Sequence, residues 1–312
     1  MSRIAPIVAQ SIAHMNRNAA VVPMNEIASR HSTMPIGGDW SIENRNADRG
    51  AAIEWLYRQP SLNVGLGASG VFCLEFPGFV TFEVNPEHCT IAICAGVEAN
   101  AETISHFLYD QVFPRIIAQD EFLVLHSAAV SGGSGAILFI GPTGAGKSTL
   151  AASLHLAGIA LIGDDAIIVR RNDSGHVAEA VYRSLRLNLD ALTALGGPWS
   201  HRAMAQYSEK RRVEEAELGD VLPPQPIAAI VVLSVGEDVH LSRLSTVEAC
   251  MTVAEHSFWL DPSDVEQTCK RLTAACDVVA ATPVYRLKFR RDFADLPVIH
   301  EQLSALLGPV AR

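Results

Sequence analysis

One nine-residue segment constrains this chain more than any other. It lies between an apolar, strand-like run over 136–140 and a helix-like run over 150–156, and it reads Gly141-Pro142-Thr143-Gly144-Ala145-Gly146-Lys147-Ser148-Thr149. Glycines let backbone N–H groups turn toward phosphate oxygens, and the start of the next helix adds partial positive charge. A strand, a Gly-rich loop and a helix in this order predict an α/β protein whose core binds phosphate groups.

The fixed positions of this segment match the Walker A pattern G-x-x-x-x-G-K-[ST], and each residue type has a chemical reason to be there. The Lys147 ammonium can reach the β- and γ-phosphates of a nucleotide, and the Ser148 hydroxyl can ligate Mg²⁺. We therefore expect ATP and Mg²⁺ as cofactors, held by residues 141–149.

Composition excludes several other classes of protein. The chain has 312 residues, of which 49% are hydrophobic, so a large core is possible, and its formal charge of −10 argues against broad nucleic-acid binding. No apolar run is long enough to span a membrane, and the first residues do not resemble a signal peptide. Six cysteines without a C-x-x-C pair are expected to be reduced core residues of a cytoplasmic protein.

The pattern of apolar residues predicts two regions, an N-terminal α+β region over 1–120 and a catalytic domain over 121–312 with a helical tail. In the first, 1–60 is irregular apart from a short helix over 51–57, the runs 71–76, 79–84 and 90–94 are typical of antiparallel strands, and 98–117 has helical spacing. Gly65 to Gly70 matches G-x-G-x-x-G, but strand-like residues follow it, so we interpret it as a turn.

In the second region the sequence predicts a mixed sheet with helices. Residues 122–130, 136–140, 159–162 and 227–235 are typical of strands, and 166–171 with 177–182 predicts a hairpin around Asn172. Residues 183–220 are polar with helical pieces, and the tail predicts helices over 247–275 and 298–308.

Two adjacent carboxylates follow the phosphate-binding loop at a distance that favours a functional role. Asp164 and Asp165 come directly after the short strand 159–162. If that strand is a parallel neighbour of the strand before the loop, both end at the same edge of the sheet. A carboxylate there can hold Mg²⁺ or accept a proton from an attacking hydroxyl. Adjacent residues of an extended chain point to opposite sides, so only one of the two carboxylates has to face the phosphates.

Three further side chains are candidates for the same site. His126 lies within the apolar run 122–130, where its ring needs a polar partner, and either a core partner or the phosphate site could supply it. Arg186 is flanked by leucines, and a buried arginine requires an anion. Lys210 begins a basic run with Arg211 and Arg212 that also fits a solvated surface.

Taken together, these segments resemble the HPr kinase/phosphorylase family. The resemblance rests on Leu125-His126-Ser127 before the loop, on the loop itself, and on Ile162-Gly163-Asp164-Asp165 after it, and it covers roughly residues 122–235. Residues 182–187, 210–212 and 296–298 resemble a divergent branch that includes lasso-peptide precursor kinases, which phosphorylate a C-terminal serine.

The resemblance implies roles for these residues. Lys147 and Ser148 would bind ATP and Mg²⁺, Asp164 would be the base and Asp165 would help to hold the metal. His126 would support the phosphate site, and Arg186 and Lys210 would face the nucleotide or the transferred phosphoryl group. Thr149 replaces the glutamate of the bifunctional enzymes, and Arg183-Ser184-Leu185-Arg186 replaces their glutamate–isoleucine–arginine–glycine run.

The function that we expect is therefore ATP-dependent phosphorylation of a serine in a peptide or protein partner, most specifically the C-terminal serine of a lasso precursor. A small-molecule kinase and a nucleotide-binding regulatory protein on the same core remain open. A GTPase would need an N-K-x-D motif, which the sequence lacks. No nucleic-acid or membrane partner is expected, and a homo-oligomer is compatible with the sequence.

Overall fold

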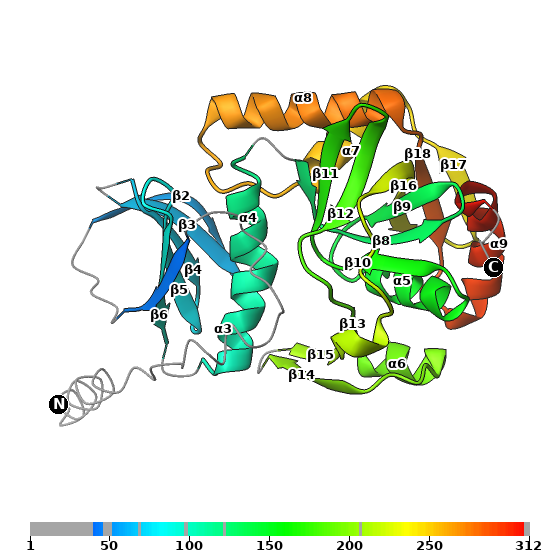
Figure 1. Cartoon of the computed structure of the whole chain (residues 1–312), viewed down its shortest axis with the longest axis horizontal. Coiled ribbons are helices and arrows are strands. Elements are labelled where there is room, and N and C mark those ends of the chain that lie inside the picture. Colours follow the sequence, from blue (N-terminus) through cyan, green and yellow to red (C-terminus); the bar gives the residue numbers. More distant parts are fainter. Residues whose placement is uncertain are drawn as a thin grey trace, which may run out of the picture. The chain divides into compact units, whose positions relative to one another are not determined.

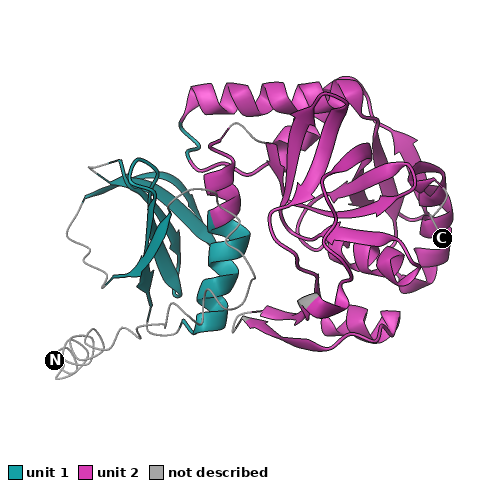
Figure 2. Ribbon diagram, in the orientation of Figure 1, with its two compact units in different colours: residues 1–112, 261–263 teal, residues 113–260, 264–312 magenta. Residues whose placement is uncertain are grey.

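The computed structural model describes residues 40–45, 52–67, 70–96, 99–120, 123–205 and 208–308. The chain forms two compact units, one of residues 1–112 with 261–263 and the other of residues 113–260 with 264–312 (Figure 2). The irregular structure predicted for 1–39 and 46–51 lies outside the described residues.

The first unit contains a six-stranded sheet in the order β1-β6-β5-β4-β3-β2, in which only the β1–β6 pair is parallel. Burial alternates along β5, so one face of that strand is packed and the other is more open. Helix α3 packs on the sheet through Phe107, whose ring stacks on Phe76 at 4.0 Å. The elements are β1 (Ser41–Asn44), β2 (Ile53–Gln59), β3 (Leu62–Gly67), β4 (Phe72–Phe76), β5 (Val80–Asn85), β6 (Thr90–Ala95), α3 (Ala101–Phe107) and the π-helix η1 (Leu108–Val112).

Most of the elements predicted in this region are present, but strand β1 lies in a segment predicted to be irregular, and one predicted helix is wrong. The antiparallel strands are confirmed, and residues 62–67 and 72–76 form a hairpin, so Gly65 to Gly70 does not precede a helix. The short helix predicted over 51–57 is instead part of strand β2. Ile53, Trp55 and Tyr57 are β-branched or aromatic residues that favour strands, and the segment pairs with β3.

The second unit is built on a nine-stranded mixed sheet (Figure 1). Its path is β10-β8-β9-β16-β12-β11-β7, and β18 pairs with both β16 and β17. The strand before the loop, β9, is buried along its whole length and lies parallel to β16. The strands are β7 (Leu123–Leu125), β8 (Ser127–Gly132), β9 (Gly135–Ile140), β10 (Ala160–Gly163), β11 (Ile167–Asn172), β12 (Gly175–Ala180), β16 (Gln225–Val235), β17 (His240–Arg243) and β18 (Val284–Phe289).

Helices cover both faces of this sheet. One core joins α5 and α9 to β8, β9 and β16, and the other joins α7 and α8 to the opposite face. A separate three-stranded sheet in the order β13-β15-β14 lies in the same unit. The remaining elements are α4 (Phe113–Ile117), α5 (Lys147–Leu156), β13 (Arg186–Leu187), α6 (Leu189–Leu195), β14 (His201–Ala205), β15 (Ser208–Val213), the 3-10 helices η2 (Glu215–Glu217) and η3 (Phe293–Asp295), α7 (Thr246–Glu255), α8 (Val265–Ala281) and α9 (Leu296–Leu307).

The predicted hairpin around Asn172 and the tail helices are confirmed, while one expectation is wrong and another is incomplete. The strand predicted over 122–130 is broken at His126, because β7 pairs with β11 and β8 pairs with β9 and β10. The polar segment 183–220 contains the expected helical pieces α6 and η2, but it also forms the small sheet β13-β15-β14. Strands β17 and β18 lie outside the predicted tail helices 247–275 and 298–308. Polar strands on a small sheet lack the long apolar runs from which strands are recognised.

All six cysteines are free, and Cys73, Cys94 and Cys250 are buried. Cys269 is exposed, so the expectation that every cysteine lies in the core is wrong. In the part of the chain that the structure describes, no helix is long and apolar enough to cross a membrane.

Candidate functional site

The loop after β9 has a backbone that only glycine adopts readily. Gly141, Gly144 and Gly146 have φ angles of 147°, 77° and 99°. At Gly141 a Cβ atom would also lie 2.9 Å from the carbonyl oxygen of Leu233, so the position has no space for a side chain. Gly146 is the N-cap of α5, and no side chain caps that helix. The first-turn N–H groups therefore lack a side-chain cap and can donate to an anion.

Two side chains at the start of α5 point to the same place. Lys147 is almost fully buried, and its ammonium donates to the carbonyl oxygens of Gly141 at 2.8 Å and Pro142 at 3.3 Å. Burial lowers the pKa of Lys147, an effect that Asp165 and Asp164 oppose. The Ser148 hydroxyl donates to Oδ1 of Asp164 at 3.0 Å. The loop is thus coupled directly to the aspartate pair.

The aspartates follow β10, which lies one strand further from the loop than expected. β10 pairs antiparallel with β8, and β8 pairs antiparallel with β9. β10 and β9 therefore run in the same direction without being neighbours, so the predicted adjacency is wrong. Both strands still end at the same edge of the sheet, which brings Asp164 to Ser148.

The two carboxylates have different partners. Asp164 is fully buried, and its Oδ2 accepts from the backbone N–H of Arg186 at 3.2 Å. Asp165 has a φ of 71°, so the chain is not extended there and the expected opposite orientation does not apply. Oδ2 of Asp165 lies 2.9 Å from Nη2 of Arg186, and Oδ1 lies 3.6 Å from Nε2 of His126.

These surroundings shift the pKa values of the two aspartates in opposite directions. Burial, together with the charge of Asp165, raises the pKa of Asp164 to about 7. Burial also acts to raise the pKa of Asp165, but Arg186 and His126 outweigh it and hold that pKa well below its usual range. Asp165 is thus the firmly ionised member of the pair, and the charge of Asp164 is costly without a cation beside it.

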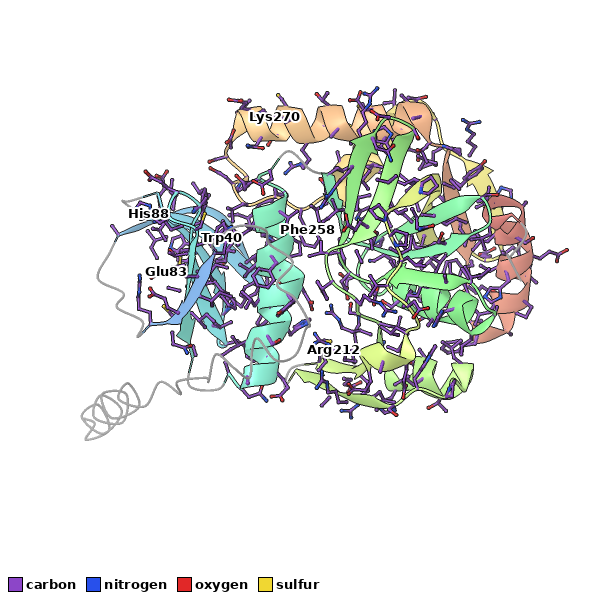
Figure 3. The ribbon with its side chains drawn as sticks, viewed as in Figure 1. Trp40, Glu83, His88, Arg212, Phe258 and Lys270 are labelled. Carbon is purple, nitrogen blue, oxygen red and sulfur yellow. The ribbon has the colours of Figure 1, made fainter. Side chains whose placement is uncertain are left out.

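His126 occupies the break between β7 and β8. Its backbone N–H donates to the carbonyl oxygen of His256 at 2.8 Å, and its ring lies 6.0 Å from that of Phe258, which Figure 3 labels. The side chain is 34% exposed. Of the two environments left open by the sequence, His126 occupies the one beside the aspartates.

The small sheet supplies the basic side chains. Arg186 on β13 is buried and pairs in register with Arg212 on β15, which is also buried and is labelled in Figure 3. The solvated surface that we considered for Arg212 is therefore wrong. Lys210 lies two residues before Arg212 on β15, so both side chains lie on the same face of the strand.

A pocket joins these segments. Besides Asn188, it is lined by ten predicted site residues: His126, Thr143, Gly144, Gly146, Lys147, Ser148, Thr149, Asp165, Arg186 and Lys210. Gly141, Pro142, Ala145 and Asp164 are not among the lining residues. Sequence reasoning missed Asn188, because an exposed asparagine before a short helix is an ordinary N-cap.

The donor set fits magnesium. Ser148 and Asp164 present adjacent hydroxyl and carboxylate oxygens, the hard ligands that Mg²⁺ prefers. A cation beside Asp164 would offset the cost of its buried charge. Among the described residues no cluster of three or more His, Cys, Asp or Glu side chains could hold a metal ion. Mg²⁺ often binds through one or two protein ligands together with substrate phosphates and water, so this set is sufficient.

The fold and the pocket define a mixed α/β protein with a strand–loop–helix anion site. No protein-family profile matches the chain, and no curated protein matches it. Among solved structures, the chain is similar to the Hpr(Ser) kinase/phosphatase from Coxiella burnetii, with 11% identity, a TM-score of 0.30, and coverage of 58% of this chain and 93% of that chain. A similarity this low carries no argument about function, which must come from the geometry of the pocket.

Proposed function

We propose that this protein transfers a phosphoryl group from Mg²⁺-bound ATP to a serine hydroxyl of a peptide or protein. The observation that carries the proposal is the position of Asp165, an ionised carboxylate that lines the same pocket as Lys147 and Ser148. A phosphate-binding loop by itself needs no such group. A kinase needs one to orient the acceptor hydroxyl and receive its proton.

The loop would hold the nucleotide. The N–H groups at the start of α5 and the Lys147 ammonium would bind the β- and γ-phosphates, with Lys147 leaving the two carbonyl oxygens it now contacts. Ser148 and Asp164 would hold the magnesium ion, which supplies charge stabilisation for the phosphates when it is bound.

The two aspartates would have the opposite roles to those that the resemblance implied, with Asp164 as a metal ligand and Asp165 as the base. Asp164 is fully buried and hydrogen-bonded to Ser148, which suits a metal-side ligand. Asp165 lines the pocket, where an acceptor hydroxyl can reach it, and Arg186 and His126 fix its position, so its location suits the base. The acceptor oxygen would bond to the γ-phosphorus as the bond from that phosphorus to the β–γ bridging oxygen breaks. The hydroxyl proton would pass to Asp165, and ADP would leave.

The narrowest form of the proposal takes as acceptor the C-terminal serine of a lasso-peptide precursor. Its support is the sequence resemblance described above. A flexible peptide end can reach a carboxylate beside the loop more easily than a folded surface can.

Two measurements test the proposal. Calorimetry should detect Mg²⁺-dependent ATP binding, and mass spectrometry of precursor peptide incubated with enzyme, ATP and Mg²⁺ should show phosphate on its last residue. ATP binding without transfer to any hydroxyl would identify a regulatory nucleotide-binding protein instead. Efficient phosphorylation of a free metabolite and of no peptide would identify a small-molecule kinase.

A further inference from the structure

Asn188 and Lys210 lie side by side at the end of the small sheet. Strands β13 and β15 are antiparallel, with Arg186 opposite Arg212 and Leu187 opposite Arg211. The same register continued by one residue puts Asn188 opposite Lys210, just beyond the last ladder pair. Both residues line the pocket that contains Asp165 and the loop. Two segments that are distant in the sequence thus place an amide and an ammonium together.

The amide of Asn188 does not perform the usual task of an N-cap. Asn188 is the N-cap of α6, yet its side chain accepts no capping hydrogen bond. Asp190 instead accepts from the N–H of Ala191 at 2.7 Å. Across the described ranges, the Asn188 side chain has no hydrogen-bond partner, so its donor and acceptor atoms are available to a ligand.

Lys210 is a further cation of this pocket, and its charge acts on Asp164 and Asp165. Lys147 is bound by loop carbonyls, and Arg186 is paired with Asp165. Within the part of the chain that the structure describes, the Lys210 ammonium makes no hydrogen bond and no ion pair within 4 Å. It belongs to the three-stranded sheet, whereas the phosphate-binding groups belong to the loop.

We propose that Asn188 and Lys210 form a subsite that binds a carboxylate next to the acceptor hydroxyl. This inference rests on the proposed function, and it specifies the acceptor as a chain whose last residue is serine with a free α-carboxylate. The ammonium and the amide NH₂ can each donate to one carboxylate oxygen. Asn188 is two residues beyond Arg186, about 7 Å along the strand, and Arg186 holds Asp165. With side-chain reach, a hydroxyl at Asp165 and a carboxylate at this subsite can belong to one residue.

The experiment compares pools of hexapeptides with randomised upstream residues. One pool ends in serine with a free carboxylate, a second ends in the serine amide, and a third carries aspartate before the serine amide. We expect the wild-type protein to phosphorylate the free-acid pool at least tenfold faster than the amide pool, because hydrogen bonds to charged groups contribute at this level. Equal rates for the free acid and the amide would overturn the inference.

Variants of Asn188 and Lys210 test whether these two side chains cause the preference for a free carboxylate. Lys210→Met and Asn188→Ala should each raise KM for the free-acid pool about tenfold more than KM for the amide pool, and so remove the preference for the free carboxylate. Arg211→Met is the matched control, because it removes the same charge one residue away on the opposite face of β15. If Lys210→Met weakened ATP binding as much as it raised KM for the peptide, Lys210 would be a nucleotide ligand and the inference would be wrong.

The third pool tests whether the subsite binds the C-terminal carboxylate or a side-chain carboxylate. If the aspartate-containing amide restored full activity, the subsite would bind a side-chain carboxylate and the C-terminal assignment would fail. Absence of ATP binding in the wild-type protein would overturn the proposed function and this inference together. Normal ATP binding with serine phosphorylation that ignores the carboxylate would overturn this inference alone.

Discussion

The two walls of the pocket are built in different ways. One wall is the continuous segment 141–149, whose backbone is set by three glycines with positive φ angles. The other consists of His126, Asp165, Arg186, Asn188 and Lys210, which come from the break between β7 and β8, from the end of β10, from β13 and the start of α6, and from β15. The first wall needs only local sequence, whereas the second depends on the pairing of β13 with β15. A continuous wall suits phosphates, which many proteins bind alike, and an assembled wall can vary with the acceptor.

The largest effect should come from the assembled wall. Asp165→Asn should lower kcat for phosphoryl transfer by roughly 10²–10⁴-fold, the usual contribution of a general base, with ATP affinity nearly unchanged. Steady-state kinetics with calorimetry measures both. Asp173→Asn, in the exposed turn between β11 and β12, is the matched control. Near-normal turnover in Asp165→Asn with loss in Asp164→Asn would restore the assignment that the resemblance implied.

A change in the continuous wall should act on the nucleotide instead. Lys147→Ala removes the buried ammonium next to the loop and should weaken Mg²⁺-ATP binding by roughly 10- to 100-fold, the value of a hydrogen bond to a charged group. Lys270→Ala removes a half-exposed ammonium on α8 that pairs with Glu266, outside the pocket, and should leave binding unchanged (Figure 3). Equal ATP affinity of Lys147→Ala and the wild-type protein by calorimetry would exclude the loop as the nucleotide site.

Two glycine substitutions distinguish an effect of the loop backbone on ATP binding from a general loss of stability. Gly146→Ala and Gly158→Ala both place a side chain at positive φ, 99° and 91°, so each should lower the free energy of unfolding by about 1–2 kcal/mol. Only Gly146 belongs to the pocket, so only its substitution should also weaken ATP binding. Denaturant titration and calorimetry test this. A loss of ATP affinity in both variants would mean that the effect is one of stability alone.

The smallest effect concerns the charge of Asp164. Because its pKa is raised to about 7, the folded protein binds a proton there more readily than the unfolded chain between about pH 4 and pH 7. This contribution to stability is present at low pH and is lost as the pH rises through 7. Without nucleotide or Mg²⁺, Asp164→Asn should therefore raise the melting temperature more at pH 8 than at pH 5, by about 2–4 °C for each kcal/mol.

The informative quantity is how the difference in melting temperature between Asp164→Asn and the wild-type protein changes with pH. Any effect of the asparagine side chain on packing is the same at every pH and does not contribute to that change. Differential scanning calorimetry at pH 5 to 8 measures it, with Asp173→Asn as the control. A difference between variant and wild type that is constant with pH would show that Asp164 has no raised pKa.

Local physics explains which elements could be predicted. The strand–loop–helix segment, the hairpin around Asn172 and the strands of the first unit carry their signals in consecutive residues. Residues 51–57 and 183–220 do not, because short strands depend on a partner for their stability. The expected break-free strand around His126 failed for a related reason. The apolar run is continuous, but its two halves pair with different strands.

By itself, the sequence determined the strand–loop–helix segment around residues 141–149, because the glycines that shape this loop act within nine residues. It also brought out His126, Asp164, Asp165, Arg186 and Lys210 as candidates, since polar groups at strand ends or among leucines need partners. Only the tertiary structure decided how these candidates meet. The direction of β10, the positive φ of Asp165 and the register of β13 with β15 determine which carboxylate faces the pocket and that Asn188 lies beside Lys210. Such relations depend on hydrogen bonds between distant segments, and no local pattern of residues encodes them.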